Sequence, residues 1–265
     1  MVSGSFTKFN IANLIDMKLL ASLSLVLISF FSNAQSLDGS WRVTEINGQA
    51  QNNEETVMIY QEGYFVFASK EARSNHFLGT GGGVYTMKNG VYEETFDFNT
   101  YNSEKVGTTV KCDIDFKNNN ELTFSYSTPD GLRKETWQRI SDEENDLNGT
   151  WVITSRKRDG NLSQMTPGAR RTVKILGGGR FQWIAFNSET KELSGTGGGT
   201  YTAKDGKYIE TIDFFSRDDS RVGAELSFDF EVIDDEWHHS GLSSRGAPIY
   251  EIWSDYREAY LNKKE

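Results

Sequence analysis

Apolar and polar residues alternate with a period of two along most of this chain, which is the pattern of β-strands that bury one face. In the first half, eight such segments follow one another, separated by short stretches of turn-forming residues. They span residues 40–47, 55–60, 64–70, 77–88, 91–99, 106–117, 121–127 and 132–140. Eight sequential strands with short turns predict an up-and-down antiparallel sheet. Closing that sheet into a barrel removes its exposed edges.

The second half of the chain repeats the first. The segment GTGGGVYTMKNGVYEETFDF at residues 79–98 returns as GTGGGTYTAKDGKYIETIDF at residues 195–214, a shift of 116 residues. The starts of the two copies, LDGSW at 37–41 and LNGTW at 147–151, are shifted by only 110 residues. The second copy therefore has six extra residues, which fall within residues 155–171 and have room for one short helix. The pattern predicts an all-β fold of two tandem barrels, over residues 37–140 and 147–257.

A tyrosine and a glutamate are predicted to face each other inside each barrel. Asn-Gly after residue 88 and Asp-Gly after residue 204 are typical of two-residue type I′ turns, which set the pairing of the flanking strands. This register places Tyr85 opposite Glu94, and Tyr201 opposite Glu210, on the apolar face. A buried carboxylate is costly unless it is hydrogen-bonded, paired, protonated or in contact with cavity water. Each pair is therefore interpreted as a polar anchor in a ligand cavity or as a structural hydrogen bond.

The glycine-rich run is interpreted as a packing device. The same register places Gly83 opposite Phe96 and Gly81 opposite Phe98, so the glycines leave room for the two rings. The other face of this hairpin, which includes Asp97, is polar and is expected to face solvent. A phosphate-binding loop would need a following helix, which the pattern does not predict.

A second inward carboxylate is predicted on the last strand of each copy, at Glu135 and Glu251. Paired carboxylates serve as general acid and base when their environments separate their pKa values. The alternative is a structural role, because sequence spacing does not show that they approach the first pair.

The seventh strand differs between the copies, because Trp237 and His239 stand where the first copy has leucine and phenylalanine. In this register His239 faces the interior near Glu210. A His–Glu–Tyr cluster suits binding of a polar ligand, a metal or haem, or proton transfer. A slip of one residue would instead place His239 in solvent beside His238.

The extra segment of the second copy is basic, with five Arg or Lys residues at positions 156, 157, 158, 170 and 171. It joins the first two strands, where the mouth of a barrel would lie. It is interpreted as a lid, as a segment that attracts an anionic ligand, or as a solvated loop.

Composition and charge exclude several classes of function. The chain has 265 residues and a net charge of −10, which disfavours nucleic acids and anionic membranes as partners. Cys112 is the single cysteine, so no intramolecular disulfide forms and the residue is expected to pack as a small core side chain. Three histidines without metal-ligand spacing predict no zinc site, and no serine-hydrolase motif occurs. No cofactor is expected.

The N-terminus has the features of an export signal. Lys18 precedes an apolar run at residues 19–31, and Ser-Asn-Ala ending at Ala34 is a small-x-small cleavage site. The run is too short to span a bilayer of ~30 Å. Residues 1–34 are therefore expected to be a signal peptide, with a possible start at Met17, and the mature protein to be secreted or periplasmic without stable membrane insertion. The alternative is an uncleaved anchor.

Motifs on the first and last strands of each copy resemble those of a known family. Gly-x-Trp on the first strand, at Trp41 and Trp151, and an arginine near the end of the last strand, at Arg139 and Arg257, resemble the barrel-closing signature of lipocalins and related calycins. In that signature the arginine would stack on the tryptophan. The GTGGG-x-Tyr-Thr and Tyr-x-Glu-Thr motifs are similar to small lipocalin-like domains in bacterial secreted proteins of unknown function. The resemblance implies a barrel and suggests binding of a small molecule.

The leading hypothesis is non-enzymatic binding of a small, partly apolar molecule, neutral, hydroxylated or cationic, with the second barrel favoured. The residues expected to line the sites are Tyr201, Glu210, His239, Trp183, Trp237 and Glu251 in the second barrel, and Tyr85, Glu94, Phe67 and Glu135 in the first. One alternative is an isomerase, hydratase or hydrolase that uses Glu210 and His239 for proton transfer. Another is a structural or protein-interaction module of the cell envelope.

Overall fold

A computed structural model describes Met1 and residues 36–88, 91–165, 168–243 and 246–261. The expected signal peptide and its cleavage site lie outside the described residues, as does the Asn-Gly turn at 89–90. Within the described part of the chain, no helix is long and apolar enough to cross a membrane. Residues 37–265 form one compact unit.

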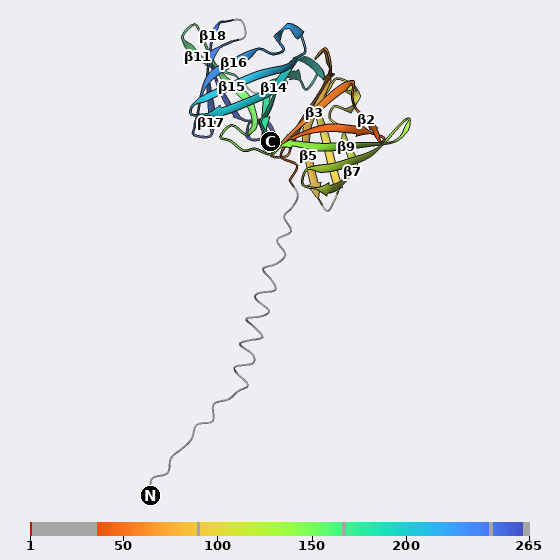
Figure 1. Ribbon diagram of the computed structural model, residues 1–265. Coiled ribbons are helices and arrows are strands. Elements are labelled where there is room, and N and C mark those ends of the chain that lie inside the picture. Colours follow the sequence, from red (N-terminus) through yellow and green to blue (C-terminus); the bar gives the residue numbers. More distant parts are fainter. Residues whose placement is uncertain (2–35, 89–90, 166–167, 244–245, 262–265) are drawn as a thin grey trace. The chain divides into compact units, whose positions relative to one another are not determined.

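The first barrel is a closed antiparallel sheet in which each strand pairs with the next (Figure 1). Its strands are β1 (Gly39–Ile46), β3 (Glu54–Gln61), β4 (Tyr64–Glu71), β5 (Phe77–Lys88), β6 (Val91–Asn99), β7 (Thr109–Asn118), β8 (Glu121–Thr128) and β9 (Gly131–Ser141). Pairing of β1 with β9 closes the barrel, and the short strand β2 (Gln49–Ala50) extends β1 as a hairpin. A 3-10 turn, η1 (Ser103–Lys105), connects β6 and β7.

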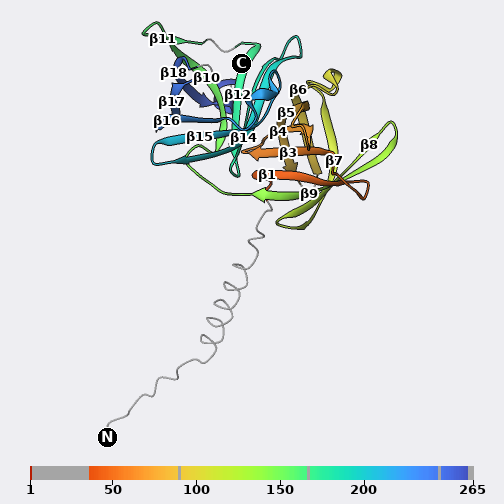
Figure 2. The ribbon, with the colours of Figure 1, turned by 45° about the horizontal axis from the view of Figure 1, so that its top comes forward.

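The second barrel repeats this topology (Figure 2). Its strands are β10 (Gly149–Arg158), β12 (Arg170–Gly177), β13 (Arg180–Asn187), β14 (Glu192–Lys204), β15 (Lys207–Phe215), β16 (Glu225–Ile233), β17 (Glu236–Leu242) and β18 (Pro248–Asp255). Pairing of β10 with β18 closes it. A 3-10 turn, η2 (Asp219–Arg221), and a final helical turn, η3 (Arg257–Leu261), complete the chain. The predicted fold of two tandem antiparallel eight-strand barrels is confirmed.

The extra segment of the second copy forms a hairpin, so the short helix expected there was wrong. Strand β11 (Asn161–Gln164) folds back on β10. Asp159 and Gly160 turn the chain with positive φ values of 49° and 83°. An Asp-Gly pair favours this type of turn, and the flanking residues therefore continue the strand.

The glycine-rich hairpin contains a β-bulge that the predicted register lacked. Gly83 pairs with Phe96 as predicted, but the register shifts between Gly82 and Gly83. Phe98 therefore lies opposite Gly82 rather than Gly81, and Asn99 lies opposite Gly81. Because side chains alternate along a strand, this extra residue turns Phe98 out of the barrel and Asn99 into it. The second copy has the same bulge between Gly198 and Gly199.

The ring of Phe98 belongs to an apolar cluster formed by the outer faces of both barrels. The cluster consists of Ile59, Tyr64, Val66, Phe98, Val152, Val173, Ile175, Ile184, Phe186 and Tyr256. Asp97 lies beside it and accepts hydrogen bonds from the hydroxyls of Tyr64 at 3.0 Å and Tyr256 at 2.8 Å. The expectation that Asp97 faces solvent was therefore wrong, because the outer face of this strand is covered.

The two closing arginines differ. The Arg139 guanidinium lies 4.2 Å from the centroid of Trp41, in the arrangement expected from the resemblance. Arg257 instead donates to the main-chain oxygen of Glu62 in the first barrel. The predicted stacking of Arg257 on Trp151 was wrong, because the second barrel ends at Asp255 and Arg257 starts η3.

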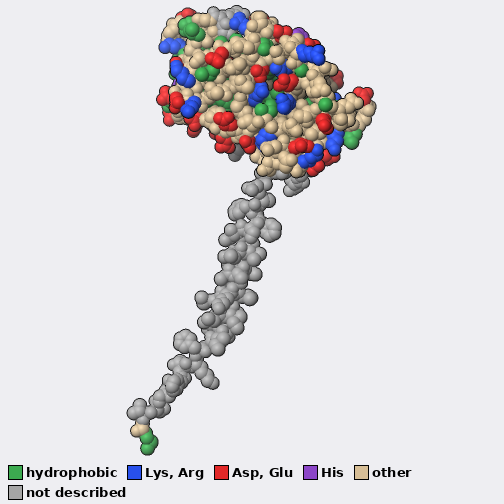
Figure 3. All heavy atoms as spheres, viewed as in Figure 1, with side chains coloured by type: hydrophobic (Ala, Val, Ile, Leu, Met, Phe, Trp, Pro, Cys, Tyr) green, Lys and Arg blue, Asp and Glu red, His purple; other side chains and the backbone are tan. Residues whose placement is uncertain are grey.

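The outer strand faces that do meet solvent are charged. Acidic and basic side chains intermix over the face seen in Figure 3. Some form exposed ion pairs across neighbouring strands, such as Lys111–Glu93 at 2.7 Å. Pairs of this kind contribute little to stability.

Candidate ligand-binding cavity

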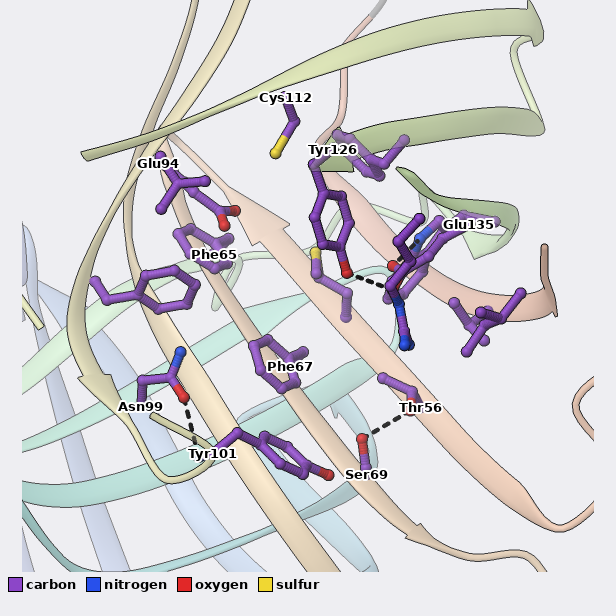
Figure 4. A pocket seen from close by; sticks show the side chains of 18 of the residues that line it. Thr56, Phe65, Phe67, Ser69, Glu94, Asn99, Tyr101, Cys112, Tyr126 and Glu135 are labelled. Atoms are coloured by element: carbon purple, nitrogen blue, oxygen red, sulfur yellow. Dashed lines mark hydrogen bonds and ion pairs between the residues drawn. The ribbon is translucent and has the colours of Figure 1, made fainter. Parts of the chain in front are cut away.

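The first barrel encloses a cavity of about 520 Å³, which is within the size range of small-molecule sites. Its wall is mainly apolar and aromatic and comes from several strands. The wall includes Val43, Met58, Phe65, Phe67, Phe96, Cys112, Phe124 and Trp137. Three glutamates also line it. Glu54 of β3 is exposed, whereas Glu94 of β6 and Glu135 of β9 lie at opposite sides of the view in Figure 4. The sequence favoured the second barrel as the ligand site, whereas this cavity lies in the first.

Glu94 is an acid held in an apolar setting. Burial raises the pKa of its carboxyl to about 7, and the hydrogen bond from the Tyr92 hydroxyl, at 3.2 Å, and the charge of Lys105 only partly oppose this effect. Within the described chain, no lysine or arginine forms an ion pair with Glu94. Part of its side chain remains accessible because it faces the cavity.

Glu135 differs because it is fully partnered. It accepts hydrogen bonds from Arg133 Nε at 2.7 Å, the Tyr126 hydroxyl at 2.7 Å and Trp137 Nε1 at 3.2 Å. Its charge is thus neutralised inside the barrel, and Glu94 is the carboxyl that has bonding capacity to offer a ligand.

Cys112 contributes a small, neutral part of the wall. Burial raises the pKa of its thiol to about 12, so the thiol keeps its proton at neutral pH. The expected packing role of this residue agrees with its position.

The tyrosines predicted to bond to the inward glutamates bond elsewhere. The Tyr85 hydroxyl donates to Asp38 at 3.2 Å, and the Tyr201 hydroxyl donates to Asn148 at 2.7 Å. The glutamates are instead reached by Tyr92 and Tyr208, each two residues earlier on the same strand. The Tyr-x-Glu motif in both copies carries this signal, because residues i and i+2 of a strand share a face.

In the second barrel, a buried lysine forms an ion pair with the inward glutamate. Lys174 Nζ lies 2.7 Å from Glu210 Oε1, which also accepts a hydrogen bond of 2.7 Å from the Tyr208 hydroxyl. Lys174 is only 5% exposed. Sequence reasoning missed this residue because the apolar residues Val173 and Ile175 flank it, which favours an outward lysine. In the structure these two residues pack in the outer cluster, and Lys174 lies on the inward face together with Leu176.

His239 lies inside the second barrel and is 2% exposed. Burial lowers the pKa of its imidazole, so the ring is neutral at pH 7. Nδ1 lies 3.4 Å from Glu251 Oε2, and Arg156 Nη2 lies 2.6 Å from Glu251 Oε1. Burial alone would raise the pKa of Glu251, but the His239 hydrogen bond and the Arg156 charge outweigh it and hold that pKa below its ordinary range. Arg156, expected in a lid, an anion-attracting segment or a solvated loop, thus pairs with the buried carboxylate of Glu251 while its own side chain stays partly exposed.

Large aromatic side chains fill the remaining interior of the second barrel. Trp237 is fully buried against Tyr208 and Trp253, and Trp183 packs against Phe215. Several of these rings stand where the first barrel has smaller or polar groups. The equivalent pairs are Cys112 and Phe228, Leu122 and Trp237, and Asn99 and Phe215. Among the described residues, the first copy thus lines a cavity of about 520 Å³, whereas larger side chains stand at these equivalent positions in the second copy.

The described residues include no group of three or more His, Cys, Asp or Glu side chains placed to hold a metal ion. The polar groups that line the cavity of the first barrel are three glutamate carboxyls from separate strands, the cationic side chains of Lys105 and Arg133, and neutral hydroxyl and amide groups. This donor set suits an organic ligand with a polar group better than a metal.

Comparison with known proteins finds a family model that matches one of the two copies. Residues 36–146 match the model of a family described as a domain of unknown function (DUF4488). This match covers the first barrel and the linker that follows it. No curated protein matches the chain.

Proposed function

We propose that the first barrel binds a small, partly apolar molecule inside its cavity, as the binding domain of an exported, lipocalin-like protein. The observation that carries the proposal is the cavity of about 520 Å³, with a mainly apolar wall and the inward carboxyl of Glu94, which forms no ion pair with a described lysine or arginine. Apolar wall area supplies affinity, and a single polar group orients the ligand. The Arg139–Trp41 stack at the barrel closure supports the lipocalin-like relationship.

The position of Glu94 also selects the kind of ligand. A carboxylate at this site repels a fatty-acid carboxylate but accepts a hydrogen bond from a hydroxyl or an ammonium group. We therefore propose a neutral, hydroxylated or cationic ligand.

The alternative of proton transfer by Glu210 and His239 has weaker support. Glu210 is engaged by Lys174 and Tyr208, and neither Glu210 nor His239 lines the cavity. A structural or protein-interaction role is the other alternative, and it makes no use of the cavity.

The test is a broad ligand screen of the mature protein by native mass spectrometry and thermal shift. A cavity-filling variant, Cys112→Phe, copies Phe228 of the second barrel and is expected to abolish binding. Cys112→Val keeps the cavity and serves as the matched control. Absence of any ligand for the wild type, or equal binding by Cys112→Phe, would contradict the proposal.

Export is tested separately. We expect the mature chain to begin near Gln35 when it is isolated from the producing cell and its N-terminus is sequenced. A retained N-terminus at Met1 or Met17 would contradict cleavage.

A further inference from the structure

The second barrel shows what the site of the first barrel is built to hold. Lys174 of the second barrel corresponds to Met58 of the first. Lys174 pairs with Trp151 on β10 and Trp183 on β13, and Met58 pairs with the equivalent Trp41 and Phe67. The two positions are thus structurally equivalent, and one carries an alkylammonium chain where the other carries a neutral thioether.

The Lys174 ammonium sits in a complete binding site. It contacts Glu210 Oε1 at 2.7 Å and lies between 5.2 and 5.7 Å from the ring centroids of four aromatic side chains. Those rings belong to Phe181, Tyr208, Trp237 and Trp253. A carboxylate combined with aromatic faces is the arrangement that recognises organic cations.

The first barrel keeps most of this site but lacks the cation. Glu94, Tyr92, Phe65 and Trp137 are the equivalents of Glu210, Tyr208, Phe181 and Trp253, and all four line the cavity together with Met58. The fourth ring of the second-barrel site, that of Trp237, is replaced by Leu122 in the first barrel. The space beside Glu94 is therefore bounded by the equivalents of most of the groups that surround the Lys174 ammonium in the second barrel.

We propose that the first barrel binds a primary alkylamine, whose ammonium group pairs with Glu94 in the position that the Lys174 ammonium holds beside Glu210. The apolar chain of the amine lies along the aromatic wall of the cavity. This inference rests on the proposed function, because it assigns the chemical class of the ligand in the same cavity.

The charged and titratable groups around Glu94 permit this pairing near neutral pH. They are Tyr92 on the same strand, Tyr60 of β3, Lys105 of η1, Cys112 of β7 and Glu135 of β9. Burial raises the pKa values of both tyrosines and of the thiol, so these three stay neutral. Glu135 is held by Arg133. Lys105 is exposed and lowers the pKa of Glu94 less than burial raises it.

The experiment compares n-hexylamine, 1-hexanol and hexanoate by titration calorimetry with the mature wild-type protein. At pH 8 hexylamine is expected to bind at least about tenfold more tightly than hexanol, the size of effect typical of a hydrogen bond to a charged group. Hexanoate is expected to bind most weakly. The preference for the amine over the alcohol should decline as the pH falls below about 7, because Glu94 takes up a proton while the amine keeps its charge.

Two variants separate this inference from a general apolar site. Met58→Lys builds the internal ion pair of the second barrel and is expected to abolish hexylamine binding, whereas Met58→Leu retains it. Glu94→Gln is expected to remove the preference for the amine while hexanol still binds, and this variant carries the test if Met58→Lys does not fold. Equal affinity for amine and alcohol, or retained amine binding in a folded Met58→Lys variant, would overturn the inference and leave the proposed function in place. No binding by these probes or by any compound in the wider screen would overturn both.

Discussion

Glu94 and Glu210 share the same local sequence, but the side chain at one equivalent position of each barrel gives them different electrostatic surroundings. Glu94 and Glu210 both follow a tyrosine by two residues and both point into a barrel. Lys174 neutralises Glu210, whereas Met58 leaves Glu94 facing an open cavity. A buried carboxylate beside an ammonium is tolerated, and one without it tends to hold its proton.

The stability of the ligand-free protein should depend on the protonation of Glu94. Its folded-state pKa of about 7 lies above the ordinary value of 4.5, so between these values the folded state binds more protons than the unfolded chain. The free energy of unfolding therefore decreases as the pH rises through this window. Glu94→Gln removes the effect and is expected to be more stable than wild type at pH 8 by about 1–2 kcal/mol, since cavity water moderates the full penalty. Urea denaturation at pH 4.5 and pH 8 measures this difference, and a pH-independent difference would contradict it.

Removing Lys174 from its buried ion pair with Glu210 should destabilise the folded protein. Lys174→Met leaves Glu210 buried without a cation and is expected to lower the free energy of unfolding by about 3–5 kcal/mol at pH 7. Lys207→Met is the matched control, because it breaks the exposed pair with Asp229 and is expected to cost less than about 1 kcal/mol. Chemical denaturation of both variants makes the comparison, and equal losses would show that burial of the pair has no effect.

At the scale of elements, the bulged glycine hairpin sets which side chains enter each barrel. The hairpin β5–β6 and its repeat β14–β15 both shift register at the third glycine of the GGG run. Periodicity predicted the strands, the turn and the pairing next to the turn. It did not predict the shift, because a bulge depends on backbone packing between the strands and leaves only a glycine as its mark. The end of the strand was therefore assigned to the wrong face, at Phe98.

The bulge glycines should not accept a side chain. A Cβ atom on Gly83 would lie within 1.9 Å of the Thr95 carbonyl oxygen, and on Gly199 the same distance from that of Thr211. Backbone atoms cannot yield as a flexible side chain can, so Gly83→Ala and Gly199→Ala are each expected to destabilise the protein by about 2–3 kcal/mol or more. The exposed Thr86→Ala on the same strand as Gly83 is the control, with an expected change within about 0.5 kcal/mol. Thermal denaturation compares them, and a neutral effect at Gly83 would contradict the described register.

At the scale of the whole molecule, the two barrels share a buried outer face. Phe98 and Phe186 rings lie 5.1 Å apart between centroids, and the Asp97 carboxylate accepts hydrogen bonds from a tyrosine of each barrel. Strand alternation alone marks these positions as solvent-facing or ambiguous. The contact explains why β3, β4, β12 and β13 carry apolar residues on both faces.

The first barrel alone should therefore be less stable than it is in the full chain. A fragment of residues 36–146 would expose Ile59, Tyr64, Val66 and Phe98, which the second barrel covers. We expect the fragment to have a lower melting temperature than the full chain and to self-associate, because an exposed apolar patch of this kind favours association. Size-exclusion chromatography and thermal denaturation test this, and a monomeric fragment as stable as the full chain would contradict it.

The sequence by itself determined the number of barrels, their strands, and the inward position of the paired glutamates. These features follow from local alternation and from an internal repeat, which need no knowledge of distant contacts. The tertiary structure decided which tyrosine reaches each glutamate, which outer face is covered, and which barrel is open. His239 and Trp237 were expected to line a ligand site in the second barrel, yet in the structure they pack inside that barrel beside Lys174. Whether a barrel is open depends on the summed volume of the inward side chains of eight strands and on where each strand bends. No single segment of the sequence contains that information.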